Sequence, residues 1–343
     1  MTSPRGGSLI RFLRAHPILC LLILTPGIPE YLSTSSSLTV LVAAPPIFFL
    51  FLGFNLALYG PGVLLIREAM VRWRKGWATV LLLGAAYAIL EEGIALSTMF
   101  NPHAGPVGSL GFYGHYAGVN WVWSVGIVMV HVLFSISVPI LLFGFVFPDR
   151  RDHPLVTPRQ ISVVAGILAV DVVLLMAVVW RSEGFFAGAP LLAGSLATMA
   201  LLIAIARVVP TDLLRAFAGR PTAPPIAFAV LGAILLPGTF LIEGVAQAEH
   251  LAPTLAMVML TAFYLVGLVL ALSFIGATCH ERQLLGFATG VLGSIAVVGF
   301  VASLPVPVVL VGDVALIVFL HRLWAAHPAP AAASSPSARS TPR

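Results

Sequence analysis

Residues 77–99 read WATVLLLGAAYAILEEGIALSTM, an apolar stretch interrupted near its end by two adjacent carboxylates, Glu91 and Glu92. About 20 apolar residues, rising about 1.5 Å each in a helix, cross the ~30 Å hydrocarbon core of a bilayer. An ionisable side chain inside such a helix costs roughly 2.5 kcal/mol or more and is a functional candidate by default. We therefore expect a membrane-spanning helix here, with a functional site at its two glutamates.

The composition of the whole chain agrees with this interpretation. Hydrophobic residues make up 59% of the 343 residues and charged residues only 9%, and the mean hydropathy is +1.03. Soluble domains carry about 25% charged residues. The composition therefore excludes a soluble protein and indicates a polytopic membrane protein.

The N-terminal segment, the cysteines and the net charge bear on three further properties: a signal peptide, disulfide bonds and nucleic-acid binding. A basic start leads into an apolar stretch from Ile18, but Pro26-Gly27 follows where a signal peptide would have a small-residue cleavage site, so we expect a first span here. Cys20 and Cys279 do not support a disulfide framework. No basic motif accompanies the net charge of +5, so we expect no nucleic-acid partner.

We predict an all-α fold, a polytopic bundle of about ten membrane helices. The apolar stretches are residues 16–29, 41–66, 77–99, 119–146, 161–180, 188–207, 226–246, 254–277, 285–303 and 305–321.

The basic residues test this topology. If the N-terminus is inside, 17 of the 18 Lys and Arg residues lie in cytoplasmic segments and only Arg181 lies outside, as the positive-inside rule requires. We therefore predict a plasma-membrane protein with both termini cytoplasmic. Residues 1–327 are expected to form one transmembrane domain, and the Ala-, Ser- and Pro-rich residues 328–343 a disordered cytoplasmic tail.

Two pairs of residues recur at offsets near 211, which would make spans one to three and seven to nine a parallel repeat. The pairs are Pro26-Gly27 with Pro237-Gly238 and Arg67-Glu68 with His280-Glu281. The second copy has no Glu-Glu pair, so only the first would carry the site.

His131, on the next span, is the expected partner of the two glutamates. Counted from Trp77 at the inner interface, Glu91 lies roughly 21 Å up, in the outer half of the membrane. Counted from Trp121 at the outer interface, His131 lies roughly 15 Å down on the returning span. The two depths differ by one or two turns, so a contact between adjacent helices is feasible.

Helical spacing distinguishes the two glutamates. Adjacent residues in an α-helix point about 100° apart, so both cannot address one partner equally. Glu91 shares its face with small residues such as Gly84 and Ala88, which suit close helix packing. We expect Glu91 to face the site and Glu92 to be a supporting acid, although the opposite arrangement stays open.

Polar residues surround this pair on the outer side. The Gly-rich segment 101–118, with His103 and His115, is expected to form an ordered lid or a simple connector. On the span of His131, Asn120 and Ser135 are candidates for a substrate or ion path.

Other acids lie within the apolar stretches. Asp171 and Asp313 would suit an ion path as well as a catalytic site. Glu30 and Glu243 lie near span ends, and we interpret them as interface residues.

The chemistry of the three central residues allows three interpretations. Two close carboxylates in a low dielectric do not both ionise easily, which leaves a proton to transfer, and His131 could orient a water that a carboxylate activates. The set could also bind a divalent metal, but its shell is incomplete without His103 or His115. It could finally be a structural polar cluster. We expect no resident cofactor.

Glu91, Glu92 and His131 resemble the motif of the CAAX-protease and bacteriocin-processing family of intramembrane enzymes. The resemblance implies a Glu-Glu pair on one span facing a histidine on the next, with a glutamate-activated water. The chain departs from the family at Leu96, where an arginine is expected, and at Ile127, where a phenylalanine is expected. No third motif of His and Asn follows.

The sequence thus favours an intramembrane hydrolase, a peptidase by resemblance, with catalytic Glu91, Glu92 and His131. The alternatives are a proton- or cation-coupled transporter and a membrane protein whose polar cluster is structural. The lipid bilayer is the expected partner, and the substrate is a membrane peptide, a lipid or an ion.

Overall fold

The protein is described from a computed structural model, which covers residues 12, 15–33, 39–211, 213–214, 223–274, 281–302 and 307–328. Almost all of these residues are helical. In chain order the elements are α2 (Pro17–Pro26), the π-helix η1 (Gly27–Leu32), α3 (Thr39–Ala43), α4 (Pro45–Arg72), α5 (Trp77–Ala88), the π-helix η2 (Ile89–Ala95), the 3-10 helix η3 (Gly105–Gly111), β1 (His115–Tyr116), β2 (Val119–Asn120), α6 (Trp121–Val130), the π-helix η4 (His131–Ser137), α7 (Val138–Val146), the 3-10 helix η5 (Pro148–Arg150), α8 (Pro158–Glu183), α9 (Ala189–Val208), α10 (Pro225–Ala248), α11 (Pro253–Phe274), α12 (Glu281–Ala302) and α13 (Pro307–Ala326).

The membrane-spanning helices match the prediction in kind. Eight helices within the described residues are long and apolar enough to cross a membrane, and they correspond to the second to ninth predicted spans. The first predicted span is a shorter apolar helix, Pro17–Leu32, and the tenth corresponds to α13, a helix of 20 residues. The all-α multi-pass bundle is confirmed, whereas ten spans, cytoplasmic termini and the parallel repeat stay predictions. The predicted tail lies outside the described residues except for Pro328.

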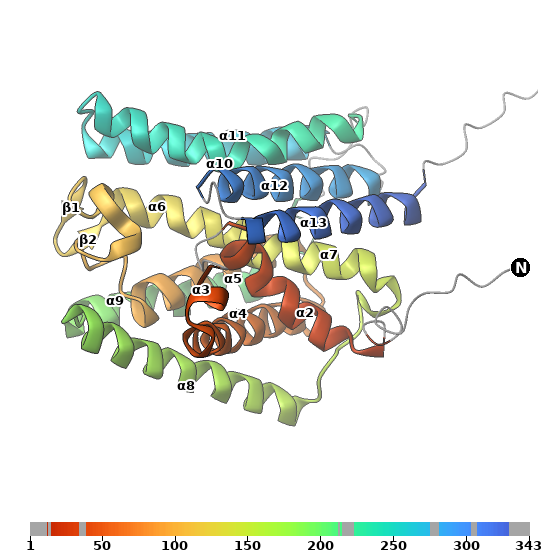
Figure 1. Ribbon diagram of the computed structural model, residues 1–343, viewed down its shortest axis with the longest axis horizontal. Helices are drawn as coiled ribbons and strands as arrows, with labels where there is room; N and C mark the ends of the chain where they lie inside the picture. The colour runs from red at the N-terminus through yellow and green to blue at the C-terminus, as the bar shows by residue number, and fades with distance from the viewer. Residues whose placement is uncertain are drawn as a thin grey trace, which may run out of the picture.

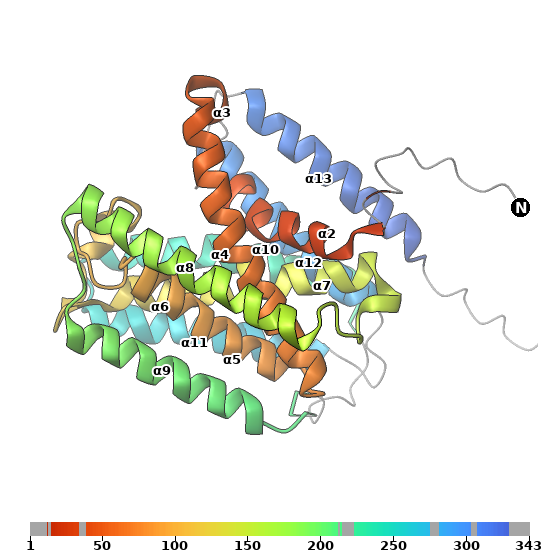
Figure 2. The same cartoon turned by 90° about the horizontal axis from the view of Figure 1, so that it is seen from below.

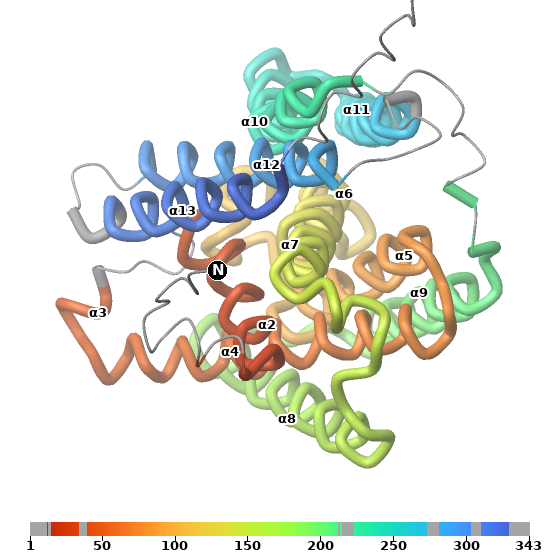
Figure 3. The backbone as a smooth tube through the Cα atoms, turned by 90° about the vertical axis from the view of Figure 1, so that its right-hand side faces the viewer, coloured from red at the N-terminus to blue at the C-terminus, as the bar shows by residue number. Residues whose placement is uncertain are grey.

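Most helices run along the long axis of the bundle, as Figure 1 shows. The helices α10 to α13 lie on one side, α8 and α9 on the other, and α5 to α7 between them. Helix α4 instead crosses the bundle obliquely (Figure 2). When the bundle is viewed along its long axis, α4 extends along one side from α3 to α5 (Figure 3). The crossing brings its middle turns against the central helices.

Burial separates central from peripheral helices. In the 18-residue apolar window of each helix, 67% of the residues are buried for the helix at 77–95 and 61% for the helix at 121–146, against 11% for α9. The helix with the two glutamates and the helix with His131 are therefore the core of the bundle, and α9 presents most of its surface outward, where lipid is expected.

Glycines allow a close contact between α10 and α12. A Cβ atom at Gly290 would lie 1.9 Å from the carbonyl oxygen of Ala229, and one at Gly232 would lie 2.4 Å from that of Phe287. The two backbones therefore touch directly, as small residues permit between membrane helices.

The segments predicted to share the cytoplasmic side meet at one end of the bundle, where α2 begins and α13 ends (Figure 1). Arg67 lies buried beside Glu68, at 2.9 Å, in the last turns of α4. Further contacts join Arg67 to the carbonyl oxygen of His153 at 2.8 Å, Lys75 to that of Val209 at 2.8 Å, and Arg151 to Glu281 at 3.1 Å. These contacts place basic segments from four parts of the chain together, as the positive-inside assignment requires.

The predicted lid lies at the opposite end (Figure 1). It contains η3 and a hairpin in which His115 pairs with Asn120 and Tyr116 with Val119. The two turn residues, Ala117 and Gly118, have φ of 50° and 76°, which is the left-handed backbone of a two-residue hairpin turn. The segment is thus an ordered loop over the site end of the bundle.

Candidate functional site

Both glutamates and the histidine lie in π-helical turns. Glu91 and Glu92 belong to η2, where the backbone N–H of Leu96 donates to the carbonyl oxygen of Glu91 at 2.8 Å, an i to i+5 bond. His131 is the first residue of η4. π-helical turns are rare, and many of them occur at functional sites.

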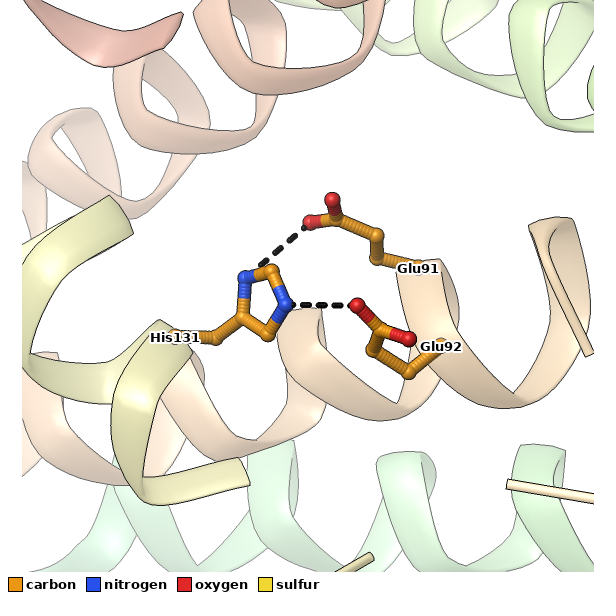
Figure 4. Close-up of side chains that lie close together, drawn as sticks. All are labelled: Glu91, Glu92 and His131. Atoms are coloured by element: carbon orange, nitrogen blue, oxygen red, sulfur yellow. Dashed lines mark hydrogen bonds and ion pairs between the residues drawn. The ribbon is translucent and has the colours of Figure 1, made fainter. Parts of the chain in front are cut away.

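The π-turn brings both glutamates to His131, at unequal distances. A π-helix places more residues in each turn than an α-helix, so neighbouring side chains diverge by less than 100°. Glu92 Oε1 lies 2.8 Å from His131 Nε2, and Glu91 Oε2 lies 3.3 Å from His131 Nδ1. Figure 4 shows the imidazole between the two carboxylates, with one ring nitrogen facing each.

The triad is removed from solvent. Glu91, Glu92 and His131 are 1%, 6% and 4% exposed. His131 Nδ1 also lies 2.9 Å from the hydroxyl oxygen of Ser135, so Ser135, predicted as a path residue, is a direct partner of the histidine. When both ring nitrogens carry hydrogen, the imidazolium donates to Glu92 and to Ser135, and its positive charge compensates one of the two negative charges beside it.

The two glutamates differ in their remaining contacts. The second oxygen of Glu92, Oε2, accepts a hydrogen bond from the Thr98 hydroxyl, which itself accepts one from Trp123 Nε1 at 3.1 Å. Oε2 of Glu91 is buried and has no hydrogen-bond partner in the described chain. Glu92 is therefore held on both sides, whereas Oε2 of Glu91 approaches His131 Nδ1, at 3.3 Å, without a hydrogen bond. Both carboxylates face the histidine, and the expectation that Glu91 is the reacting one stays a prediction.

Two tyrosines that no sequence pattern indicated flank the histidine. The rings of Tyr59 and Tyr87 lie 6.3 and 6.4 Å from the imidazole, and that of Tyr59 is nearly parallel to it. The Tyr59 hydroxyl donates to Glu30 Oε1 at 2.7 Å. Glu30, interpreted from the sequence as an interface residue, therefore belongs to the periphery of the site.

Glu30 and Tyr59 differ in how far the sequence could have indicated them. The criterion that indicated Glu91, an acidic residue in or beside an apolar stretch, could also have indicated Glu30. Tyr59 gave no comparable signal, since the oblique crossing of α4 that brings it to His131 is a tertiary feature.

The outer residues connect to the triad through Thr98. Asn120 is fully buried, and its amide donates to the carbonyl oxygens of Thr98 at 2.7 Å and of Asn101 at 3.1 Å. Its Oδ1 atom lies 2.6 Å from Nδ1 of the exposed His115 in the hairpin. A chain of polar contacts thus joins the lid to the backbone of the residue that holds Glu92.

The other predicted residues lie apart from the triad. His103 is exposed and packs edge-on against Phe112. Asp171 is 4% exposed and Asp313 half-buried, and one oxygen of each is buried without a hydrogen-bond partner in the described chain. No hydrogen bond or ion pair within the described ranges connects either aspartate to the triad.

The three side chains also satisfy the distance requirement for a metal site. One ligand atom from each of Glu91, Glu92 and His131 lies within 4.8 Å of the others. However, each imidazole nitrogen already faces a carboxylate oxygen, so an ion bound by His131 would displace one of these contacts. His103 and His115, expected as further ligands, are exposed and form other contacts. The geometry therefore suits a hydrogen-bonded triad better than a complete metal shell.

Comparisons with protein-family models, with curated proteins and with solved structures give no match. The resemblance to the CAAX-protease and bacteriocin-processing family therefore stays a prediction, and the case for a function depends on the geometry of the triad.

Proposed function

We propose that Glu91, Glu92 and His131 form the active site of an intramembrane hydrolase, with a peptide bond as the preferred substrate. The observation that carries this proposal is that Oε2 of Glu91 is buried, lies 3.3 Å from His131 Nδ1 and makes no hydrogen bond in the described chain. A buried acceptor of this kind needs a partner. A water molecule that it could deprotonate is a chemically suitable one.

In the proposed reaction Glu91 is the general base. It takes a proton from water while the water oxygen bonds to the substrate carbonyl carbon. When the bond between that carbon and the leaving nitrogen breaks, Glu91 returns the proton to the nitrogen. A positioned carboxylate of this kind contributes about 10²- to 10⁴-fold in rate.

His131 and Glu92 keep the base in position. The short contact from His131 Nε2 to Glu92, at 2.8 Å, fixes the ring, and Ser135 and Thr98 fix the outer ends of the pair. The positive imidazolium beside Glu91 compensates its charge in a medium of low dielectric. We therefore assign His131 and Glu92 to positioning and charge compensation and Glu91 to proton transfer.

The test compares two buried membrane acids. Glu91→Gln removes the base and keeps the shape of the side chain. Glu243→Gln is the matched control, because Glu243 is 6% exposed and lies against Gly126 on α6, outside the triad. Purified wild-type protein and Glu243→Gln should cleave members of a membrane-peptide library, and Glu91→Gln should be at least 100-fold slower. Equal cleavage by wild type and Glu91→Gln would refute the assignment.

Proton- or cation-coupled transport is the second candidate. The observation that favours it is the buried Oδ2 atom of Asp171, which has no hydrogen-bond partner among the described residues, since an isolated membrane acid suits an ion path. Transport predicts ion flux in proteoliposomes that Asp171→Asn abolishes. Peptide hydrolysis that is unaffected by Asp171→Asn would instead favour the hydrolase.

A further inference from the structure

Hydrolysis at Glu91 requires a second group, one that donates a hydrogen bond to the carbonyl oxygen as it becomes negative. His131 is the obvious donor, but its two nitrogens already face Glu92 and Glu91, and Nδ1 also contacts Ser135. It could donate to a substrate only by giving up one of these partners. The donor must therefore be sought among the neighbours of the triad.

Most neighbouring donors are also engaged. The Tyr59 hydroxyl donates to Glu30, the Thr98 hydroxyl to Glu92, and Trp123 Nε1 to Thr98. These three groups could not serve a substrate without breaking an existing hydrogen bond.

Tyr87 is different. It is 4% exposed, and its hydroxyl makes no hydrogen bond of good geometry in the part of the chain that the structure describes; the acceptor that it approaches is Glu91. Its ring contacts those of His131 and Tyr59. The hydroxyls of Ser124 and Ser137 are also buried and unpaired. No described contact joins either serine to the triad.

The backbone fixes the position of Tyr87. It precedes Glu91 by four residues, which places the two side chains on one face of the helix. Its ring packs on Gly62 of α4 so closely that a Cβ atom at Gly62 would lie 2.2 Å from the ring. Glycine at this position therefore leaves room for the ring, and the crossing of α4 holds it beside the base.

We propose that Tyr87 is a catalytic residue that donates its hydroxyl hydrogen bond to the carbonyl oxygen of the substrate. This role deepens the proposed hydrolase function and rests on it. As the water oxygen bonds to the carbonyl carbon, the carbonyl π electrons move to the oxygen, which the Tyr87 hydroxyl stabilises. The electrons return when the carbon–nitrogen bond breaks, and Tyr87 keeps its proton throughout. The ligand class is a carbonyl compound, here a membrane peptide.

The test compares two tyrosine variants of the full-length protein. Tyr87→Phe removes the hydroxyl and keeps the ring on Gly62. The matched control is Tyr264→Phe, because Tyr264 is a buried tyrosine on α11 whose hydroxyl is bonded to Thr239, outside the triad. We expect Tyr87→Phe to lower kcat by about 10²- to 10³-fold with KM unchanged. Tyr264→Phe should change kcat less than 10-fold.

A second measurement does not depend on turnover. An uncleavable peptide ketone with a ¹³C-labelled carbonyl is bound to each protein, and its infrared stretching frequency is recorded. Wild type and Tyr264→Phe should lower the frequency relative to Tyr87→Phe. If Tyr87→Phe does not fold, replacement of Tyr87 by 3-fluorotyrosine, a stronger donor of nearly equal size, should lower the frequency further.

The outcomes separate the two proposals. Hydrolysis by wild type with the same kcat in Tyr87→Phe, or a carbonyl frequency that is independent of residue 87, overturns the role of Tyr87 and leaves the hydrolase proposal standing. Absence of hydrolysis by wild type with every peptide tried overturns both.

Discussion

Replacing Thr98 with valine should weaken both the fold and the site, because this threonine links Glu92 to α6. Valine keeps the shape of the side chain and removes the hydroxyl, so Glu92 Oε2 loses its donor and Trp123 Nε1, at 3.1 Å, loses its acceptor. A hydrogen bond to a charged group contributes about 1.5–3 kcal/mol, and a neutral one between membrane helices about 0.6 kcal/mol. We therefore expect the free energy of unfolding to fall by about 2–3.5 kcal/mol.

The matched control is Thr198→Val. Thr198 is exposed on α9, and its hydroxyl donates to the carbonyl oxygen of Gly194 at 2.8 Å within the same helix, so its loss should cost less than about 0.5 kcal/mol. Unfolding of both variants in mixed micelles, followed by tryptophan fluorescence and circular dichroism, measures the difference. Equal free energies of unfolding in Thr98→Val and Thr198→Val would refute the link from Thr98 to Glu92.

Two further predictions concern the histidine and the buried arginine. Zn²⁺ should inhibit hydrolysis, because an ion that binds His131 displaces a carboxylate from it. EDTA alone should leave hydrolysis unchanged. Loss of activity in EDTA with recovery in Zn²⁺ would instead identify a metal enzyme. Arg67→Met should lower the free energy of unfolding by about 3 kcal/mol, near the lower end for a broken buried ion pair, since Glu68 keeps its contact with Arg72 at 3.0 Å. The exposed Arg159→Met is its control, and an equal effect of the two variants in the unfolding assay would contradict the buried role of Arg67.

The fold was largely predictable because its signals are local in the sequence. Apolar length alone located the spans from 41–66 to 285–303, each of which overlaps a helix long enough to cross a membrane. The distribution of Lys and Arg residues independently predicted which segments lie on the cytoplasmic side. Contacts such as that of Lys75 with Val209 join two of these segments. The contact of Glu91 with His131 followed from similar depths on consecutive spans.

The details of the site were less predictable because they depend on tertiary packing. The 100° rotation of an α-helix separated Glu91 from Glu92, but the π-turn brings both to His131. No local pattern in residues 89–95 predicts a π-turn. The position of Tyr59 beside His131 likewise depends on the oblique path of α4, which no periodicity in residues 45–72 predicts.

The most direct test of the central claim is a single turnover of a membrane peptide in water labelled with ¹⁸O. If Glu91 acts as a general base, the new carboxyl terminus of the product carries one ¹⁸O atom already in the first turnover, and Glu91→Gln forms no product on that timescale. An unlabelled carboxyl terminus in the first turnover would show that a protein oxygen attacked the carbonyl, which contradicts the general-base role.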